Sequence, residues 1–471
     1  MPSARSKKDA NEPGAPLRVG MISLGCAKNL VDGETMLGHL QRSGVEVTAD
    51  ATAADVVLVN TCGFITDAKR ESIDSILEVV QAKEQGEVRR LVVTGCMAQA
   101  YAEELRREIP EIDAFVGLDE LERIGEAVRG EMAAHIPDQR GALKVYDHQN
   151  PRVLSTGGYG YLKVAEGCNN PCAFCHIPAM RGSFRSRPID DLVAEARSLE
   201  DRGVQELVLI AQDTTRYGED LDLRYGLRSL VEALLSETGI PWIRFLYAYP
   251  ATLDHGLFDL MAAESRFLPY LDIPLQHASR SVLKAMKRGG SASSYLQMIE
   301  KARATVPDLV LRTTFIVGFP EEGEAEFGEL MDFIEQVEFD HLGVFTYSWQ
   351  EENPGAALGD PVPEEEKVAR RDAVLEMQQG IALAKNTALV GKRLPAIVSG
   401  PLAEMDLLLE GRLQRQAPEI DGRLLINDGS AAAGSLVEVE VTEAHPYDVV
   451  GRIVQVVREG RATVPFLPVV G

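Results

Sequence analysis

Three cysteines lie within eight residues of one another and form a C-x-x-x-C-x-x-C pattern at Cys168, Cys172 and Cys175. Iron–sulfur clusters are normally held by four cysteine thiolates, and zinc ribbons use two separated C-x-x-C pairs. No fourth cysteine lies near this triplet. Three thiolates can bind three irons of a cubane and leave the fourth iron open, so the pattern predicts a [4Fe-4S] cluster with one vacant position. A zinc site and a plain electron-transfer cluster are the alternatives, although a carrier cluster is expected to have a fourth ligand.

The composition is that of a globular protein without a membrane span. The chain has 471 residues, 45% of them hydrophobic and 25% charged, which suits about three domains. No stretch approaches the roughly 18 consecutive apolar residues of a membrane helix. Residues 1–16 are short and polar, so we expect a disordered tail in a cytoplasmic protein and no secretory signal. In that reducing compartment six cysteines favour metal binding over disulfides.

The segment 17–133 alternates short apolar runs with stretches of helical spacing. Buried parallel strands are predicted at Val19–Leu24, Val56–Asn60 and Leu91–Thr94, and helices at 29–41 and 67–83. This βαβ alternation predicts an α/β fold, with a doubly wound N-terminal domain.

A cysteine closely follows each of these three strands, at Cys26, Cys62 and Cys96. The carboxyl ends of parallel strands meet at one edge of the sheet, where such folds bind ligands. Neighbouring glycines let the backbone approach a bulky group. We therefore expect the three thiols to converge on a second three-thiolate cluster, with three buried core cysteines as the alternative.

A linker is expected at 134–153, followed by a central domain at 154–386. Its six apolar runs, separated mostly by helical stretches, predict a partial (β/α)6 barrel with its chemistry at the strand carboxyl ends. The runs are 161–165, 206–211, 242–248, 270–273, 310–317 and 342–347. After a helix at 364–390, five more runs between Gly and Asp turns predict a small, OB-like closed β-barrel at 387–460. These runs are 394–398, 407–413, 423–426, 436–442 and 449–457.

The triplet resembles the defining motif of the radical S-adenosylmethionine enzymes, C-x-x-x-C-x-aromatic-C, with Phe174 at the aromatic position. The resemblance implies that the open iron binds S-adenosylmethionine and that reduction of the cluster splits this cofactor to a 5′-deoxyadenosyl radical. The domain order resembles the methylthiotransferases, in which N-terminal cysteines hold an auxiliary cluster and the last domain is called TRAM. Two [4Fe-4S] clusters are thus implied, one on Cys168, Cys172 and Cys175 and one on Cys26, Cys62 and Cys96.

Several short runs resemble the RimO type within this family. They lie at 25–32, 175–178, 181–182, 185–188, 274–279 and 417–422. The transfer-RNA-modifying MiaB type instead carries Gln-Met-Asn after its first cysteine, and this run is absent here. One departure is Gly-Phe-Pro-Glu-Glu-Gly at 318–323, where the family usually has Pro-Gly-Glu-Thr.

The RimO resemblance implies addition of a methylthio group to the β-carbon of an aspartate in protein twelve of the small ribosomal subunit. Radical abstraction suits this carbon, because its C–H bond is too weakly acidic for a base to deprotonate easily, and the cofactor supplies the radical. An electron donor such as flavodoxin or ferredoxin is also implied. The rival interpretations are a transfer-RNA methylthiotransferase and a two-cluster protein without catalysis.

The charge of the chain favours a basic protein partner over a nucleic acid. The formal net charge is −24, and the segment 387–460 holds 7 Lys and Arg against 11 Asp and Glu, a net of −4. A barrel that binds RNA phosphates is expected to carry the opposite sign. An acidic barrel instead complements a basic ribosomal protein of the small subunit, so nucleic-acid binding is not expected as the main role.

Other polar residues near the triplet have more than one interpretation, and none is predicted to be catalytic. His176 could tune the cluster, but a packing role is favoured. Arg181, Arg185 and Arg187 predict a local basic patch that meets a cofactor carboxylate, a substrate carboxylate or solvent. The run 212–214 could contact S-adenosylmethionine or form an ordinary strand-to-loop turn.

Overall fold

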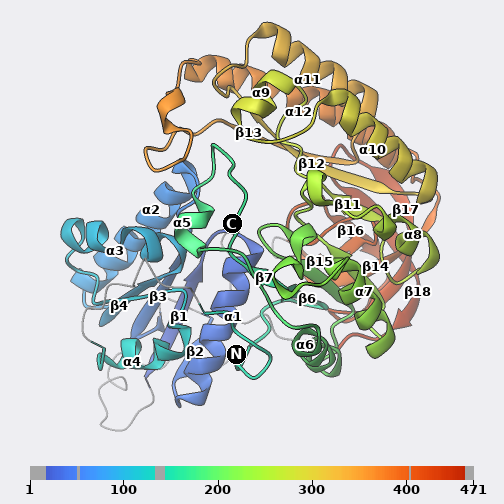
Figure 1. Cartoon of the computed structure of the whole chain (residues 1–471). Helices are drawn as coiled ribbons and strands as arrows, with labels where there is room; N and C mark the ends of the chain where they lie inside the picture. Colours follow the sequence, from blue (N-terminus) through green and yellow to red (C-terminus); the bar gives the residue numbers. More distant parts are fainter. Residues whose placement is uncertain (1–16, 50–52, 133–143, 403–404, 462–471) are drawn as a thin grey trace. The chain divides into compact units, whose positions relative to one another are not determined.

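The computed structural model describes residues 17–49, 53–132, 144–402 and 405–461, with only the backbone at 405–407. These residues belong to two compact units: a first unit of residues up to 155 together with 179–181, and a second unit of the remaining residues (Figure 1). The expected tail at 1–16 and the first half of the expected linker, residues 134–143, lie outside the described residues. None of the described helices has both the length and the apolar content needed to cross a bilayer.

The first unit contains a five-stranded parallel sheet in the order β2-β1-β3-β4-β5. Its elements are β1 Arg18–Ser23, α1 Ala27–Arg42, β2 Glu46–Thr48, β3 Val56–Thr61, α2 Thr66–Glu84, β4 Arg90–Thr94, α3 Gly95–Glu108, β5 Ala114–Val116, η3 Leu121–Arg123 and α4 Ile124–Arg129. This strand order is that of flavodoxin-like doubly wound folds, in which ligands bind beyond the carboxyl ends of the strands. The predicted doubly wound domain is confirmed.

The centre of this sheet is apolar because helices cover its faces. Every residue of β3 is buried. Val57 of β3 and Val93 of β4 pack in one core with Ile76 of α2 and Ala98 of α3. The strands β2 and β5, which were not predicted, are three-residue strands at the two edges of the sheet.

The second unit begins with alternating strands and helices. Its elements up to the last long helix are β6 Tyr159–Lys163, β7 Ala165–Glu166, α5 Ile177–Arg181, β8 Arg185–Ser186, α6 Ile189–Asp201, β9 Glu206–Ile210, α7 Gly226–Glu237, β10 Trp242–Phe245, α8 Gly256–Ala263, β11 Tyr270–Asp272, α9 Arg280–Ala285, α10 Ala292–Thr305, β12 Val310–Val317, α11 Glu324–Val337, β13 His341–Thr346 and α12 Glu364–Thr387. Short 3-10 helices occur at η4 Thr214–Arg216, η5 Glu219–Leu221, η6 Pro250–Thr252 and η7 Ala356–Leu358. The last three residues of α5 belong to the first unit.

Six of these strands form an incomplete parallel barrel, as predicted. They are hydrogen-bonded in two sheets, β10-β9-β6 and β11-β12-β13. A parallel bridge between Ile243 and Phe267 joins the two sheets. Among the described strands, β6 and β13 are not hydrogen-bonded to each other, so the barrel is open between them. The helices α6, α7, α8, α10 and α11 lie along its outer side (Figure 1).

The C-terminal strands form a closed barrel in the order β14-β15-β16-β18-β17, which confirms the predicted small β-barrel. Its strands are β14 Arg393–Leu402, β15 Met405–Leu413, β16 Leu424–Asp428, β17 Leu436–Ala444 and β18 Val449–Arg458. Alternate residues of β17, namely Val437, Val439 and Val441, point into its core, as the two-residue period of a strand requires.

The loop 417–422 fixes this small barrel to the amino-terminal ends of the partial barrel's strands. Glu419 accepts a hydrogen bond from the hydroxyl of Tyr159 at 2.7 Å. Asp421 accepts one from the hydroxyl of Tyr270 at 2.6 Å and one from Nε of Arg312 at 3.2 Å. These partners lie on β6, β11 and β12 near where each strand begins. The carboxyl ends of the strands therefore face away from the small barrel.

Candidate metal centres

Cys26, Cys62 and Cys96 lie at the carboxyl ends of β1, β3 and β4, which are neighbours in the first sheet. Cys26 is the N-cap residue of α1, and Cys96 is the second residue of α3. Cys62 lies in the loop between β3 and α2. The fold thus brings the three predicted cysteines to one edge of the sheet, and two of them to helix N-termini, where a thiolate is favoured.

Buried amide and hydroxyl side chains tie these three strand ends together. Nδ2 of Asn29 donates to the carbonyl oxygen of Leu24 at 2.6 Å and to that of Thr61 at 3.3 Å. Nδ2 of Asn60 donates to the carbonyl oxygen of Asn29 at 2.9 Å, and Oγ1 of Thr61 donates to that of Thr94 at 2.5 Å. Because these bonds run from one strand end to the next, they fix the spacing of the cysteine-bearing loops.

Two glycines bring the same loops into backbone contact. Gly25 and Gly95 both have a φ of +91°, a conformation that favours glycine. A Cβ atom on Gly25 would lie 2.9 Å from Cβ of Cys62, and one on Gly95 would lie 2.4 Å from the carbonyl oxygen of Thr61. Neither position has room for a side chain.

A buried arginine contacts one thiol of this N-terminal trio. Nε of Arg181 donates to Sγ of Cys96 at 3.2 Å, and Nη2 forms an ion pair with Asp32 at 3.0 Å. Arg181 was predicted to belong to a local basic patch. That prediction is wrong for Arg181, because its side chain is only 1% exposed.

The thiols of the trio influence one another electrostatically. Burial, together with the neighbouring thiols of Cys96 and Cys26, raises the pKa of Cys62 to about 12. Burial also opposes ionisation of Cys26, but the positive charges of Lys28 and Arg181 hold the pKa of this thiol below its ordinary value. Cys26 is thus the thiol of the trio for which ionisation is most favoured.

Cys168, Cys172 and Cys175 lie on the loop that follows β6 and β7, at the carboxyl end of the partial barrel. The backbone N–H of Asn170 donates to Sγ of Cys168 at 3.4 Å, and Nη1 of Arg288 donates to Sγ of Cys172 at 3.6 Å. Such donors favour a thiolate over a thiol. Asn170 and Arg288 were not predicted, because Arg288 lies far from the triplet in sequence and nothing in the motif distinguishes Asn170.

Neighbouring barrel loops hold the cysteine loop on two sides. On one side, Nδ2 of Asn170 donates to the buried carboxylate of Asp213 at 2.7 Å. On the other side, the N–H of Ala173 donates to the carbonyl oxygen of Met286 at 3.0 Å. The N–H of Gly355 donates to the carbonyl oxygen of Ala173 at 2.8 Å. The loop is therefore held in place by contacts from several strand ends.

Each of the two donor sets consists of three thiols, the ligand type that holds iron–sulfur clusters. Burial, together with the nearby thiols of Cys172 and Cys168, raises the pKa of Cys175 to about 12. In the described part of the chain, no three or more His, Cys, Asp or Glu side chains gather as ligands of one ion. In a cluster, each of the three thiols binds a different iron, so the sulfur atoms do not have to gather around one metal position. Metal binding must release the thiol protons.

The other predicted polar residues have structural partners. Gln212 donates to Glu166 at 3.0 Å, and Asp213 holds Asn170, so the run 212–214 supports the cysteine loop. Nδ1 of His176 lies 3.0 Å from the carbonyl oxygen of Glu352, in keeping with the favoured packing role.

The predicted basic patch is also wrong for Arg187. Its side chain is buried, and it forms ion pairs with Asp191 and Glu195, each at 2.7 Å. Arg185 is half-buried and donates to the carbonyl oxygen of Ser183. The sequence shows three nearby arginines but not the carboxylates that the fold brings to them.

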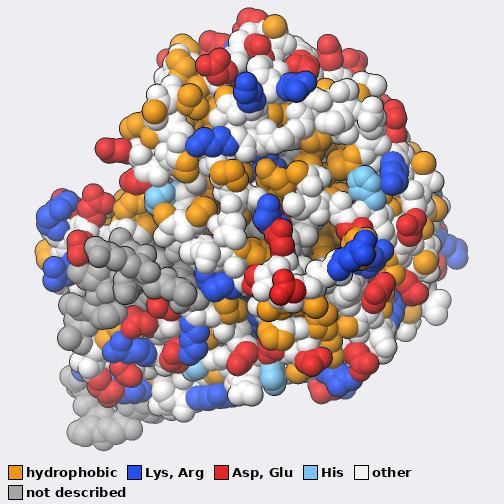
Figure 2. Space-filling model, viewed as in Figure 1, with side chains coloured by type: hydrophobic (Ala, Val, Ile, Leu, Met, Phe, Trp, Pro, Cys, Tyr) orange, Lys and Arg blue, Asp and Glu red, His pale blue; other side chains and the backbone are white. Residues whose placement is uncertain are grey.

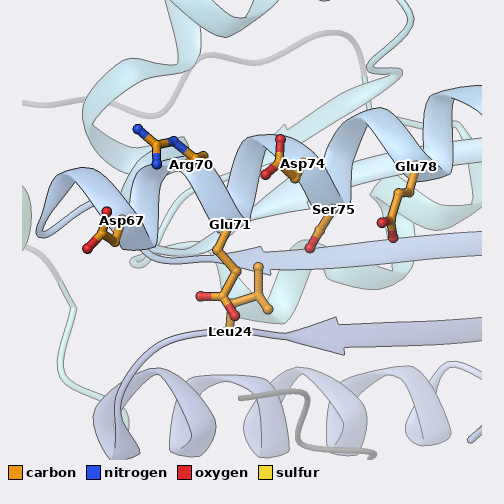
Figure 3. Close-up of a pocket in the computed structure, with 7 residues that line it drawn as sticks. All are labelled: Leu24, Asp67, Arg70, Glu71, Asp74, Ser75 and Glu78. Carbon is orange, nitrogen blue, oxygen red and sulfur yellow. The ribbon is translucent and has the colours of Figure 1, made fainter.

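A surface cavity of about 390 Å³ lies between α2 and Leu24, two residues before Cys26. Its lining is mainly acidic, with Asp67, Glu71, Asp74 and Glu78, and Figure 3 shows the Glu71 side chain pointing toward Leu24. On the face of the molecule in Figure 2, acidic and basic side chains are interspersed, and no broad band of basic side chains is visible. Neither feature resembles a surface built for phosphates.

Family models match three parts of the chain in succession. They are the uncharacterized protein family UPF0004 at residues 18–117, the Radical SAM superfamily at 162–334 and the TRAM domain at 390–454. The first two matches each contain one cysteine trio.

Curated relatives match nearly the whole chain. The protein named ribosomal protein uS12 methylthiotransferase RimO from Solibacter usitatus is 46% identical, over 93% of this chain and 95% of its own length. The proteins of the same name from Anaeromyxobacter sp. and Symbiobacterium thermophilum are 47% and 48% identical. Each match covers 93% of this chain, and 93% and 91% of those two relatives.

Among solved structures, the chain is similar to the radical S-adenosylmethionine methyltransferase TsrM from Kitasatospora setae, with cobalamin and a [4Fe-4S] cluster bound. The TM-score is 0.54 at 14% identity, over 73% of this chain and 77% of that one. At this identity the likeness concerns the fold alone.

Proposed function

The chain belongs to the RimO family of radical S-adenosylmethionine methylthiotransferases, and on this basis we propose that it adds a methylthio group to the β-carbon of an aspartate in ribosomal protein uS12. The observation that carries the proposal is a pair of three-cysteine sites. Each lies at the carboxyl edge of a parallel sheet, and none of the six cysteines is left over as a fourth ligand. The relatives from Solibacter, Anaeromyxobacter and Symbiobacterium are all named for uS12 and not for transfer RNA.

We propose that Cys168, Cys172 and Cys175 hold the cluster that binds S-adenosylmethionine. In this assignment the cluster supplies, when bound, the electron that cleaves the cofactor. Asn170 and Arg288 donate N–H groups to the thiolates of this site. The loop contacts of Asn170 and Ala173 keep the three sulfurs at fixed positions.

We propose that Cys26, Cys62 and Cys96 would hold the auxiliary cluster, which would supply the sulfur for the transfer. The amide network of Asn29 and Asn60 fixes the spacing of the three sulfurs. The 1%-exposed Arg181 adds a hydrogen bond to one of them. The chain's contribution at both sites is to hold thiolates, exclude water and orient the reacting groups.

A basic protein substrate is supported by the charge of the chain, which is −24 overall. Two acidic residues of the C-terminal barrel, Glu419 and Asp421, lie in its junction with the partial barrel. Two basic residues of the C-terminal barrel lie there too, because Arg412 pairs with Glu206 and Arg415 pairs with Asp340. Arg458 also contacts the partial barrel, where it donates to Gln205 at 3.4 Å. The junction therefore uses charged residues of both signs, and the acidic excess of the segment remains available. Acidic surfaces speed encounter with basic partners.

We further propose that the protein acts in the cytoplasm with a small electron donor of the flavodoxin or ferredoxin class. A ribosomal substrate is found there, and six thiols that bind iron must stay reduced. A donor of this class would supply the electron for the cleavage of S-adenosylmethionine.

The proposal is tested by the intact mass of uS12 from a bacterial host that lacks its own uS12 methylthiotransferase. Expression of this chain is expected to add the mass of one methylthio group to uS12, located on an aspartate by fragmentation. A matched Cys172→Ala chain is expected to add none. A new methylthio nucleoside in transfer RNA, with uS12 unmodified, would contradict the proposal.

A further inference from the structure

Arg181 is buried to an unusual degree for an arginine. Its side chain is 1% exposed, and the Asp32 side chain with which it pairs is 4% exposed. Buried arginines are rare unless they are paired, because removing the charge from water is costly. The ion pair with Asp32 explains how this charge is tolerated inside the first unit.

The ion pair alone does not account for the orientation of the guanidinium. Nη2 faces Asp32, whereas Nε donates to Sγ of Cys96 at 3.2 Å. Cys96 is also buried, so the guanidinium contacts this sulfur away from solvent. Arg181 also lies only six residues beyond Cys175 in the sequence, immediately after the cluster-binding triplet.

We infer that Arg181 is a positioning residue that sets the reduction potential of the cluster on Cys26, Cys62 and Cys96. The inference rests on the proposed assignment of these cysteines to an auxiliary cluster. Hydrogen bonds to sulfur, local charge and solvent exposure determine the potential of such clusters. A cation that donates to a ligating sulfur stabilises the reduced, more negative state and therefore raises the potential. The carboxylate of Asp32 acts in the opposite direction.

Because Arg181 and Asp32 shift the reduction potential in opposite directions, an electrostatic role can be distinguished from a purely structural one. Removing the positive charge with Arg181→Gln is expected to shift the potential to a more negative value. Removing the negative charge with Asp32→Asn is expected to shift it to a more positive value. The double variant, which is neutral at both positions, is expected to lie between them. A purely structural ion pair predicts the same effect for both single variants, namely weaker cluster retention.

The experiment uses the full chain with Cys168, Cys172 and Cys175 replaced by alanine, so that only the auxiliary cluster is measured. After anaerobic reconstitution this parent is expected to hold about four irons. Its midpoint potential is then measured by electron paramagnetic resonance during stepwise reduction, alone and with each variant. Arg187→Gln is the matched control, because Arg187 is also buried and ion-paired but it pairs with Asp191 and Glu195. This control is expected to leave the potential unchanged.

The possible results separate the inference from the assignment on which it depends. A parent without iron would contradict the proposed cysteine assignment itself. A parent with iron whose potential is the same after Arg181→Gln would overturn the role of Arg181 alone. If the Arg181→Gln protein does not retain its iron, the midpoint potential of the Asp32→Asn protein is the test. An unchanged or more negative potential in the Asp32→Asn protein contradicts the inference. Loss of iron from both single variants also overturns it, since a purely structural ion pair gives that result.

Discussion

Asn29 illustrates how one amide can hold several loops in place. Its Nδ2 group faces the carbonyl oxygens of Leu24, Asn60 and Thr61 at 2.6, 3.4 and 3.3 Å, and the side chain is buried. Buried carbonyl groups that lose their donors are costly. The residue therefore supports the positions of Cys26 and Cys62 through the backbone of the loops that carry them.

Replacement of Asn29 by alanine is expected to lower the free energy of unfolding of the first unit by about 2–3 kcal/mol, because buried acceptors lose their donor. Denaturant unfolding followed by circular dichroism measures this change. The partly exposed Asn150, whose side chain donates to Asp147 within its own turn, provides the control Asn150→Ala. That change is expected to stay within about 0.5 kcal/mol. Equal losses for the two variants would contradict the role given to Asn29.

The places of the cysteines in the fold could be predicted from the sequence, because one trio forms a compact motif and each cysteine of the other trio follows an apolar strand. The side-chain contacts around the cysteines could not be predicted from the sequence. Arg181 and Arg187 lie close together in one arginine-rich segment, but the fold places one beside Cys96 and Asp32 and the other beside Asp191 and Glu195. Burial and distant partners depend on tertiary packing, which a single sequence does not show.

At the scale of elements, the close contact between β3 and the start of α3 depends on Gly95. Both Gly95 and Gly86 have positive φ, at +91° and +72°. A Cβ on Gly95 would lie 2.4 Å from the carbonyl oxygen of Thr61, whereas nothing lies within 4 Å of one on Gly86. The two glycines share the conformational constraint but differ in the space around them.

Gly95→Ala is therefore expected to displace α3 and the Cys96 thiol, and to lose about half of the protein's iron. Gly86→Ala is expected to keep all of it, at a cost of about 1 kcal/mol in stability. Iron analysis after anaerobic reconstitution measures the difference. Full iron content in the Gly95→Ala protein would show that the close packing of these loops is not needed for cluster binding.

The longer elements were predicted well because their apolar periods are strong. The apolar run at 310–317 coincides with β12, and the strand ends at the residue where the run ends. The loop at 318–323, where the family motif is absent, is organised by Glu322. Its carboxylate accepts the N–H of Gly318 at 2.9 Å and pairs with Arg370 at 2.9 Å. Arg370 lies on α12, a contact that no local pattern reveals.

At the scale of the whole second unit, the two barrels are joined through buried charge. Asp421 accepts hydrogen bonds from the N–H of Ala417, the hydroxyl of Tyr270 and Nε of Arg312. Its side chain is 0% exposed. Since this junction lies at the amino-terminal strand ends, the small barrel leaves the cluster end of the partial barrel uncovered.

Asp421→Asn leaves Arg312, whose side chain is only 15% exposed, with less compensating charge and is expected to destabilise the junction by about 3 kcal/mol. Hydrogen exchange is expected to rise in the loop 417–422 and at the starts of β6 and β11. Asp428→Asn, which changes an exposed residue at the end of β16, is the control and is expected to have little effect. Unchanged exchange in the Asp421→Asn protein would contradict the proposed junction.

The domain order was predictable because the hydrophobic period changes from α/β alternation to consecutive strands near residue 390. The burial of charges at the barrel junction could not be predicted from the sequence, although the RimO-like run 417–422 marked the loop that forms this junction. The boundaries proposed at 17–133, 154–386 and 387–460 remain predictions.

The central claim is that each trio of cysteines holds its own cluster with one open iron. Iron and acid-labile sulfide in anaerobically reconstituted protein measure it most directly. The native chain is expected to bind about eight irons. Replacing Cys26, Cys62 and Cys96 together by alanine, or Cys168, Cys172 and Cys175 together, is expected to leave about four irons in each variant. Only the second variant is expected to stop 5′-deoxyadenosine formation. Full iron content in either triple variant would contradict the claim.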